Sequence, residues 1–399
     1  MVLGGVLMFP ALSDKTLALS EKVAHATMGI DALYRQETGA ESDREGLVVV
    51  QMAEVSPTPF ASYGEAQEYL ADLAQQALAL PEPDRRLYYT QACTSLWSFC
   101  AWRQGKLERM SDQISLFLHA DPAPATSAQL DGYYRQLRSL LTEMGYTGDI
   151  KAQIAAWEAK NLVPADEVQD TMNTMMVQAR EMCGRILPLP ENDYYHCETV
   201  RGVSYNASSD FAHRRVLINI DPILTKQKLK HLVCHEVYPG HFMQFTLRRQ
   251  AWEQGVGGLD GVLSVCNHSS SCTFEGIADA GISFLGWEEG LDDRANDLVS
   301  LIQAALGSAA SYRLHTLGWE SSRVEDFLRD NAPGGGEGWV ANRIKFIQDP
   351  ARAALIFSYW RGDEGVFPVW NRVAPEDRAR FFGYIYGRLH TVQSLQLFS

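Results

Sequence analysis

Apolar residues recur at the three- and four-residue spacing of an amphipathic helix through most of the first half of the chain. This pattern predicts helix after helix, separated by breaks that contain proline, such as residues 121–126. The expected helices cover residues 13–36, 65–80, 84–104, 106–119, 127–144, 149–160 and 165–185. The aromatic stripe within 84–104 is expected to be core. Residues 1–185 are therefore predicted to be an all-helical scaffold, and nothing in their pattern indicates a particular chemistry.

The pattern changes after residue 185. Residues 186–213 are irregular and aromatic, and residues 214–220 (RRVLINI) form the clearest predicted β-strand. Asp221 followed by Pro222 predicts the start of the next helix, because aspartate caps helices and proline suits their first turn. The exposed edge of such a strand can bind an extended peptide, or it can be an ordinary sheet edge.

Composition limits the classes of function. The 399-residue chain has 46% hydrophobic and 21% charged residues, which is ordinary for a globular protein. A formal charge of −14 with no visible basic face argues against nucleic acid as a partner. The seven cysteines contain no CxxC pair and are expected to be reduced thiols. Residues 1–13 lack a basic segment, and the chain has no run of 18 apolar residues, so we expect a cytoplasmic protein with no membrane partner.

Residues 231–244 (HLVCHEVYPGHFMQ) carry the candidate chemistry. His235 stands beside Glu236, and His241 follows a Pro-Gly pair at 239–240. Zinc hydrolases commonly place two histidines four residues apart on one helix, with a glutamate beside the first. Here the histidines are six residues apart, which would leave their rings roughly 120° apart around an ideal helix. The Pro-Gly pair predicts a break at 237–240 that swings His241 back toward His235.

A carboxylate 34 residues after His241 could complete a metal site. Glu275 and Asp279 are four residues apart and share one helix face. The segment around them is apolar and rich in small residues, where a solvated acidic pair is the less expected interpretation. We predict that Glu275 is the third metal ligand and that Asp279 accepts a hydrogen bond from a ligand histidine.

Other residues offer competing interpretations. His231 is four residues before His235, so these two could bind a metal without His241. His268, seven residues before Glu275, could be a ligand or have no role in the site. His196 and His213 could line a cleft, whereas Cys234 is expected to be a buried inert thiol. The glycine-rich run 332–338 lacks a following GK[ST] and is predicted to be a flexible connection.

The motif resembles HExxPGHxxQ, a pattern of the bacterial family called domain of unknown function 885, which is itself similar to the gluzincin metallopeptidases. The matching residues are His235, Glu236, Pro239, Gly240, His241 and Gln244. Three weaker segments of that family are matched by Glu275, Gly276 and Ala278, by Leu314, His315, Gly318 and Trp319, and by Pro350, Ala353, Tyr359 and Gly362. The resemblance covers roughly residues 200–365. It departs from the family at Ile277, Ala280, Ser311 and Arg313, so it supports the metal site better than the substrate pocket.

The resemblance implies a zinc-dependent peptidase, a metallo-exopeptidase of carboxypeptidase or dipeptidase type that binds one Zn²⁺. Glu236 would be the general base, and Tyr359 or His315 would stabilise the oxyanion. Arg343, Arg352 and Arg361 are candidate partners for a substrate carboxylate. Two alternatives stay open: a zinc amidase that acts on non-peptide amino-acid conjugates, and a degenerate binding protein.

We therefore predict a mainly α protein with one small β-sheet. The expected division is an N-terminal helical lobe, residues 1–185, and a zincin-like catalytic lobe, residues 186–399, which could also pack as one continuous domain. The expected partner is a peptide or a small amide substrate.

Overall fold

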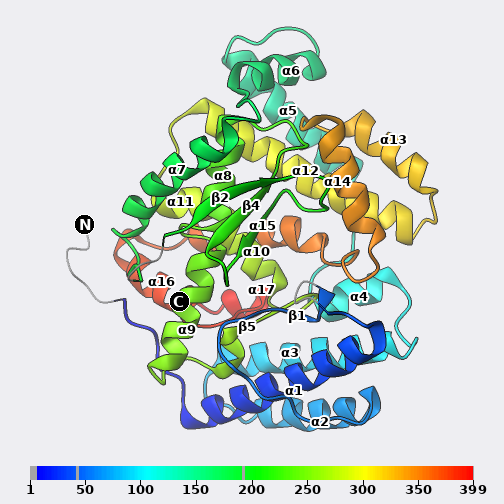
Figure 1. Cartoon of the computed structure of the whole chain (residues 1–399), viewed down its shortest axis with the longest axis vertical. Coiled ribbons are helices and arrows are strands. Elements are labelled where there is room, and N and C mark those ends of the chain that lie inside the picture. The colour runs from blue at the N-terminus through cyan, green and yellow to red at the C-terminus, as the bar shows by residue number, and fades with distance from the viewer. Residues whose placement is uncertain (1–6, 42–44, 191–193, 399) are drawn as a thin grey trace. The chain divides into compact units, whose positions relative to one another are not determined.

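The computed structural model describes residues 7–41, 45–190 and 194–398. Within these residues the protein is mainly helical, as predicted, but it has two small β-sheets, one two-stranded and one three-stranded, where the sequence predicted one (Figure 1). The chain forms two compact units, each assembled from separate segments. The first unit contains Met1–Pro122, Met243–Ile277 and Arg361–Ser399, and the second contains Ala123–Phe242 and Ala278–Trp360. The boundaries follow residues 122, 242, 277 and 360, so the division does not fall at residue 185.

The first unit is built on helices from the N-terminal part of the chain. Its complete elements are α1 (Asp14–Thr38), β1 (Val48–Gln51), α2 (Tyr63–Ala77), α3 (Pro83–Arg103), α4 (Met110–Phe117), the short helix η2 (Leu259–Val262), β5 (Leu263–Val265), η3 (Pro375–Asp377), α16 (Arg378–Gly387) and α17 (Val392–Leu395). Each helix predicted before residue 120 is present. Strand β1 pairs antiparallel with β5, which corrects the expectation that residues 1–185 are all helical.

Helix α3 carries the aromatic stripe into the core of this unit. Tyr88, Leu96 and Phe99 are buried, as predicted. Trp97 is 42% exposed, because consecutive positions on a helix point about 100° apart and Leu96 occupies the inward position. The stripe is therefore structural, apart from this one outward residue.

The second unit combines helices with the three-stranded sheet. Its complete elements are α5 (Ser127–Glu143), α6 (Ile150–Asn161), α7 (Val168–Cys183), β2 (His196–Val200), β3 (Ala207–Asp210), β4 (Arg215–Asn219), α8 (Lys226–Glu236), α11 (Gly281–Leu285), α12 (Leu291–His315), α13 (Ser321–Asn331) and α14 (Gly336–Gln348). Helices α7 and α8 pack against each other and contact this sheet (Figure 1). Among the largest fully buried side chains are Trp157, Trp339 and Trp360.

The predicted strand is confirmed as β4, but its place in the sheet is different from the expectation. The strand order is β2-β4-β3, with β2 parallel and β3 antiparallel to β4. Strand β4 is therefore central, and neither of its edges is open for an extended peptide. The segment predicted to be irregular supplies both neighbours of β4, although residues 191–193 of that segment lie outside the described residues.

The helix that carries His235 begins later than predicted. Thr225 is its N-cap and accepts a hydrogen bond from the backbone N–H of Lys228. Asp221 instead accepts hydrogen bonds from the Gly202 backbone and from Arg201, so its carboxylate is engaged elsewhere. Because these hydrogen bonds occupy the Asp221 carboxylate, it does not cap the helix, and the predicted start at Asp221 was wrong.

Three helices continue from one unit into the other: α9 (His241–Glu253), α10 (Ser271–Asp279) and α15 (Phe357–Trp370). None of the helices in the described part of the chain is long and apolar enough to cross a membrane. The first six residues of the apolar N-terminus lie outside the described residues.

Candidate metal centre

The predicted break lies between α8 and α9. Helix α8 ends at Glu236, and Val237 leaves the helical region at φ −123° and ψ −81°. The Tyr238–Pro239 peptide bond is cis, and α9 begins at His241. A Cβ atom on Gly240 would lie 1.7 Å from the carbonyl oxygen of His235, which only glycine avoids. The Pro-Gly pair therefore breaks the helix where the sequence predicted it.

The break brings His235 and His241 together. Their ring centroids are 4.6 Å apart, and the ring planes meet at 79°. Both side chains are buried. Two imidazoles at this separation can offer nitrogen atoms to one ion, which an unbroken helix with the same spacing could not do.

Asp279 fixes the ring of His235. The Nδ1 atom of His235 lies 2.8 Å from a carboxylate oxygen of Asp279, which accepts its hydrogen. Burial alone would raise the pKa of Asp279, but the charge of His235 and hydrogen bonds from His231 and His235 outweigh it and hold that pKa far below its usual range. Because Nδ1 donates to Asp279, a metal ion would bind His235 through its Nε2 atom.

His231 contacts the same carboxylate. Its Nε2 atom lies 3.3 Å from Asp279 Oδ1, and the ligand atoms of His231, His235 and Asp279 lie within 4.8 Å of one another. Burial and then the neighbouring charge of Lys228 lower the pKa of His231 to about 4, although Asp279 opposes them. These three residues could therefore hold an ion without His241, so the alternative that uses His231 stays open.

Helix α10 places Glu275 one turn before Asp279. The two residues lie on one continuous helix and share a face, although the boundary between the compact units falls after Ile277. In the first unit, Gln244 on α9 donates a side-chain hydrogen bond to the carbonyl of Phe274, the residue before Glu275. Glu275 as third ligand remains a prediction.

Glu236 is the last residue of α8 and directly follows His235. Its side chain is buried, and the structure gives its carboxylate no hydrogen bond or ion pair with another described residue. A buried carboxylate in this position is a good candidate for accepting a proton.

Tyr195, which sequence reasoning missed, lies in the same neighbourhood. Its ring packs on Phe242, with centroids 4.4 Å apart, and its buried hydroxyl has no hydrogen-bond partner within the described residues. Burial raises the pKa of this phenol, the neighbouring Ser209 hydroxyl opposes the rise, and the charges of Asp210 and Glu236 add to it, so the hydroxyl stays protonated. The tyrosine precedes β2, inside the segment that had been predicted to be irregular, and so no periodic pattern could indicate its place.

The two predicted oxyanion donors lie in different surroundings. Tyr359 is on the first turn of α15, and its ring centroid lies 6.3 Å from that of Phe346. His315 is exposed at the end of α12, where one ring nitrogen lies 2.6 Å from the carbonyl oxygen of Ile347. Ser300 on α12 accepts a hydrogen bond from Lys228 on α8, and His315 is 15 residues further along, about 22 Å at the rise of a helix. His315 thus connects the end of α12 to α14, and its role in the site remains a prediction.

The three arginines predicted as partners for a substrate carboxylate also lie in different surroundings. Arg343 packs near the rings of Trp339 and Phe346, and burial lowers its pKa while nearby Tyr359 opposes that shift. Arg352 pairs with Asp349, and Arg361 in the first unit pairs with Glu364 and Asp121. Arg343 is therefore the candidate that lies in the interior of the second unit.

The remaining candidates have ordinary surroundings. His196 pairs with Glu198 and His213 with Asp210, both at exposed positions. Cys234 is buried, and burial raises the pKa of its thiol, as expected for an inert residue. All seven cysteines are free thiols.

No protein-family model matches the chain, and no curated protein does. Among solved structures, the chain is similar to a candidate lipoprotein from Colwellia psychrerythraea, with a TM-score of 0.55 and 14% identity, over 97% of this chain and 76% of that one. It is also similar to a candidate lipoprotein of unknown function from Shewanella oneidensis, with a TM-score of 0.47 and 12% identity, over 84% of this chain and 70% of that one. At such identities the first likeness shows the fold alone. The family resemblance and the zincin-like fold remain predictions from the sequence.

Proposed function

We propose that the protein is a zinc-dependent hydrolase of peptide bonds, and specifically a metallo-exopeptidase. The observation that carries this proposal is the broken helix that brings the His235 and His241 rings to 4.6 Å, with His235 held by Asp279. Two buried imidazoles held this close together are in the arrangement that two ligands of one metal ion require. The HExxPGHxxQ pattern of the sequence agrees with this proposal.

The donor set fits zinc. Two neutral imidazoles and one carboxylate are the usual protein ligands of a catalytic zinc ion, and the Asp279–His235 hydrogen bond is the usual support for such a ligand. We propose His235, His241 and Glu275 as the ligands. Glu275 is included because one turn of α10 separates it from Asp279, and because its neighbour Phe274 is bonded to α9. A zinc ion bound there would polarise an amide carbonyl and activate water.

The residues around the proposed ligands would move protons and stabilise charge. Glu236 would take a proton from the attacking water and return it to the leaving amine, a role that suits a buried carboxylate with no hydrogen bond or ion pair among the described residues. Tyr195 would donate its phenolic hydrogen to the developing oxyanion, because its hydroxyl is protonated and buried, and the geometry gives it no hydrogen-bond acceptor among the described residues. Tyr359 is the second candidate for that donor.

The test is a comparison of Glu236→Gln with wild type on a library of short peptides with free or blocked ends. We expect turnover by wild type to require a free peptide end. The kcat of the variant should be at least about 1,000-fold lower than that of wild type, which is the loss expected when an essential catalytic residue is removed. Its zinc content should stay unchanged. Glu181→Gln, on the exposed face of α7, is the matched control and should keep full activity.

Three results would contradict parts of this proposal. Activity that survives Glu236→Gln would remove Glu236 as the base. Hydrolysis of small amides without any hydrolysis of peptides would favour the amidase alternative. Stoichiometric zinc with no turnover of any amide would favour a binding protein.

A further inference from the structure

Arg343 on α14 is a cation without an anionic partner. It lies in the interior of the second unit, where its guanidinium carbon is 5.5 Å from the ring centroid of Trp339 and 6.0 Å from that of Phe346. Within the described residues its guanidinium makes no hydrogen bond and no ion pair, and its Nε atom is enclosed without a partner. A charge taken out of water is costly unless a counter-charge compensates it, so a ligand that carries one would be favoured here.

Helix α12 holds the stem of Arg343 and leaves its end open. Gly307 on α12 has no side chain, and a Cβ atom there would lie 3.5 Å from Cδ of Arg343 and 3.1 Å from Ile356. The aliphatic part of the arginine therefore lies against this glycine. The residue is only partly buried, and its two terminal nitrogens, unlike Nε, are not enclosed. A ligand can therefore reach these nitrogens.

A second cation lies along the same face of α12. Lys228 on α8 donates a hydrogen bond to Ser300 on α12, at 3.4 Å, and it forms no ion pair within the described residues. Ser300 precedes Gly307 by seven residues, so both positions lie on one face of α12, about 10.5 Å apart along the helix. Two long cationic side chains, from α8 and from α14, thus lie over one helix face.

The charges around these two residues favour an anion. Burial lowers the pKa of Lys228 to about 8, so its amine is still largely protonated at pH 7. Among neighbouring charges, that of Asp279 opposes this shift, that of Arg343 adds to it, and that of Asp297 opposes it. Burial also lowers the pKa of Arg343, and among the described residues Tyr359, rather than a carboxylate, opposes that shift. An anionic ligand beside Arg343 would stabilise both cations.

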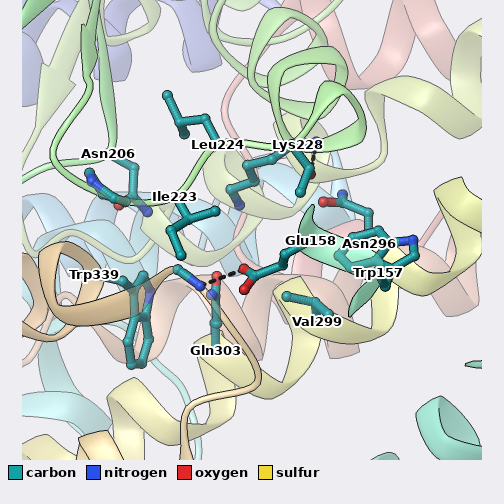
Figure 2. Close-up of a pocket in the computed structure, with 13 residues that line it drawn as sticks. Trp157, Glu158, Asn206, Ile223, Leu224, Lys228, Asn296, Val299, Gln303 and Trp339 are labelled. Carbon is teal, nitrogen blue, oxygen red and sulfur yellow. Dashed lines mark hydrogen bonds between the residues drawn. The ribbon is translucent and has the colours of Figure 1, made fainter. Parts of the chain in front are cut away.

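The small pocket beside Lys228 is not the place for such a ligand. Figure 2 shows Lys228 and Glu158 facing this pocket from different elements. The space left free in it is about 30 Å³, which one or two water molecules fill. An organic anion does not fit there, so the open terminal nitrogens of Arg343 are the position where it can bind.

The glycine-rich run forms a wall of the same pocket. Glu158 accepts a hydrogen bond from the backbone N–H of Gly335, at 2.7 Å. Gly334 has φ +137°, and a Cβ atom there would lie 2.4 Å from a carboxylate oxygen of Glu158. Any other residue at this position would displace the carboxylate. The run predicted to be a flexible connection is therefore packed against α6.

We infer that the substrate is a peptide with a free C-terminal carboxylate and that Arg343 binds this carboxylate. A guanidinium presents parallel N–H groups that match the two oxygens of a carboxylate. Lys228 adds positive charge on the same face of α12. The charge of Asp279, the residue that holds His235, also acts on Lys228, so the carboxylate site and the candidate metal centre belong to one neighbourhood of the second unit.

Cleavage at the carboxyl end rests on the proposed hydrolysis, whereas carboxylate binding by Arg343 requires neither zinc nor turnover. The substrate class is narrower than the one proposed above, since an exopeptidase can act from either end of a peptide. A carboxylate held by Arg343 makes the protein a carboxypeptidase in its specificity. Binding and hydrolysis can be measured separately.

The first test is calorimetric titration of the full chain with hydrocinnamate and hydrocinnamyl alcohol. The two probes share an aromatic side chain and differ in the carboxylate, and neither contains an amide bond that could be hydrolysed. We expect wild type to bind hydrocinnamate at least about tenfold more tightly than the alcohol, and Arg343→Gln to show no such preference. Arg138→Gln, at an exposed position on α5, is the matched control and should bind as wild type does.

The second test is hydrolysis of one short peptide supplied with both ends free, with an acetylated N-terminus or with an amidated C-terminus. Wild type should cleave the first two with similar kcat/KM and the amide with a kcat/KM at least about 100-fold lower. Arg343→Gln should lose the same factor on the free peptide, mostly through KM. Arg343→Lys should recover part of the loss, because an ammonium keeps the charge but not the paired N–H groups.

The outcomes separate the carboxylate site from the hydrolysis. Equal affinity of wild type for the two probes would overturn the inference, and this comparison requires no variant. A preference for hydrocinnamate that survives Arg343→Gln would also overturn it, because the carboxylate would then bind elsewhere. Cleavage that requires a free N-terminus and tolerates the C-terminal amide would do the same. A carboxylate preference that depends on Arg343, with no hydrolysis of any peptide, would refute only the proposed function.

Discussion

The Nδ1 atom of His235 lies 2.8 Å from a carboxylate oxygen of Asp279, 44 residues further along the chain. This contact orients the ring that the broken helix presents beside His241. Carboxylates in this position keep a ligand histidine in one tautomer and raise its basicity. The contact therefore links α8 to the end of α10 in a way that suits metal binding.

Loss of this carboxylate should weaken the metal site. We expect Asp279→Ala to bind zinc about 10–100-fold more weakly than wild type, because the His235 ring loses the acceptor that fixes it. Competition with a chromophoric chelator measures this directly. Asp330→Ala, at an exposed position on α13, is the control. Unaltered zinc affinity in Asp279→Ala would show that Asp279 has no supporting role.

The break between α8 and α9 should tolerate no side chain at Gly240. Because a Cβ atom would lie 1.7 Å from the His235 carbonyl oxygen, we expect Gly240→Ala to lower the free energy of unfolding by about 3 kcal/mol or more. Urea denaturation monitored by circular dichroism provides the measurement. Gly132→Ala, inside α5, should instead stabilise by up to about 1 kcal/mol, since alanine favours a helix and nothing crowds that position. Equal stability of the two variants would contradict the geometry of the break.

The features of the site that could be predicted from the sequence are those that depend only on residues adjacent in the chain. A proline and a glycine between two histidines have conformational consequences at those residues, so the break at 237–240 could be predicted. The helices of the first 185 residues were predicted for the same reason, because their apolar spacing is periodic. The position of β4 in the centre of its sheet could not, since its two partners lie in segments with no alternating pattern.

Tyr195 should matter more for turnover than Tyr359. If its buried hydroxyl stabilises the oxyanion, Tyr195→Phe should lower kcat about 100-fold and leave KM nearly unchanged. Tyr194→Phe, its exposed neighbour, is the control in steady-state kinetics on whichever peptide wild type cleaves best. Should Tyr359→Phe show the loss while Tyr195→Phe does not, the assignment based on sequence would be the right one.

Acid should destabilise the protein through buried histidines. Burial lowers the pKa of His268 to about 3, whereas an unfolded histidine has a pKa near 6.5. Between these values the unfolded state binds more protons, so the stabilisation is complete above about pH 6.5 and is lost as the pH falls. From pH 7 to pH 5 this one group should account for about 2 kcal/mol of the free energy of unfolding.

Urea titrations of wild type and His268→Gln at both pH values test this contribution. The variant should lose about 2 kcal/mol less than wild type on acidification, while His213→Gln, an exposed position, should not reduce the loss. Identical pH dependence in wild type and His268→Gln would show that His268 does not stay neutral in the folded state.

The structure of the glycine-rich run and the pocket beside Lys228 could not be predicted from the sequence. Residues 332–338 have the composition of a linker, and only their backbone geometry beside Glu158 indicates a built wall. Glu158 and Lys228 are 70 positions apart, and no spacing rule relates them. Charges brought together by tertiary packing leave no periodic signal.

The most direct test of the proposed metal centre is the zinc content of four purified proteins, measured by elemental analysis: wild type, His235→Ala, His241→Ala and His231→Ala. We predict one zinc per chain in wild type and in His231→Ala, and less than a tenth of that in the other two. Full zinc in His241→Ala together with its loss in His231→Ala would place the ion on His231, His235 and Asp279 instead. Wild-type protein that takes up no zinc would contradict the whole account.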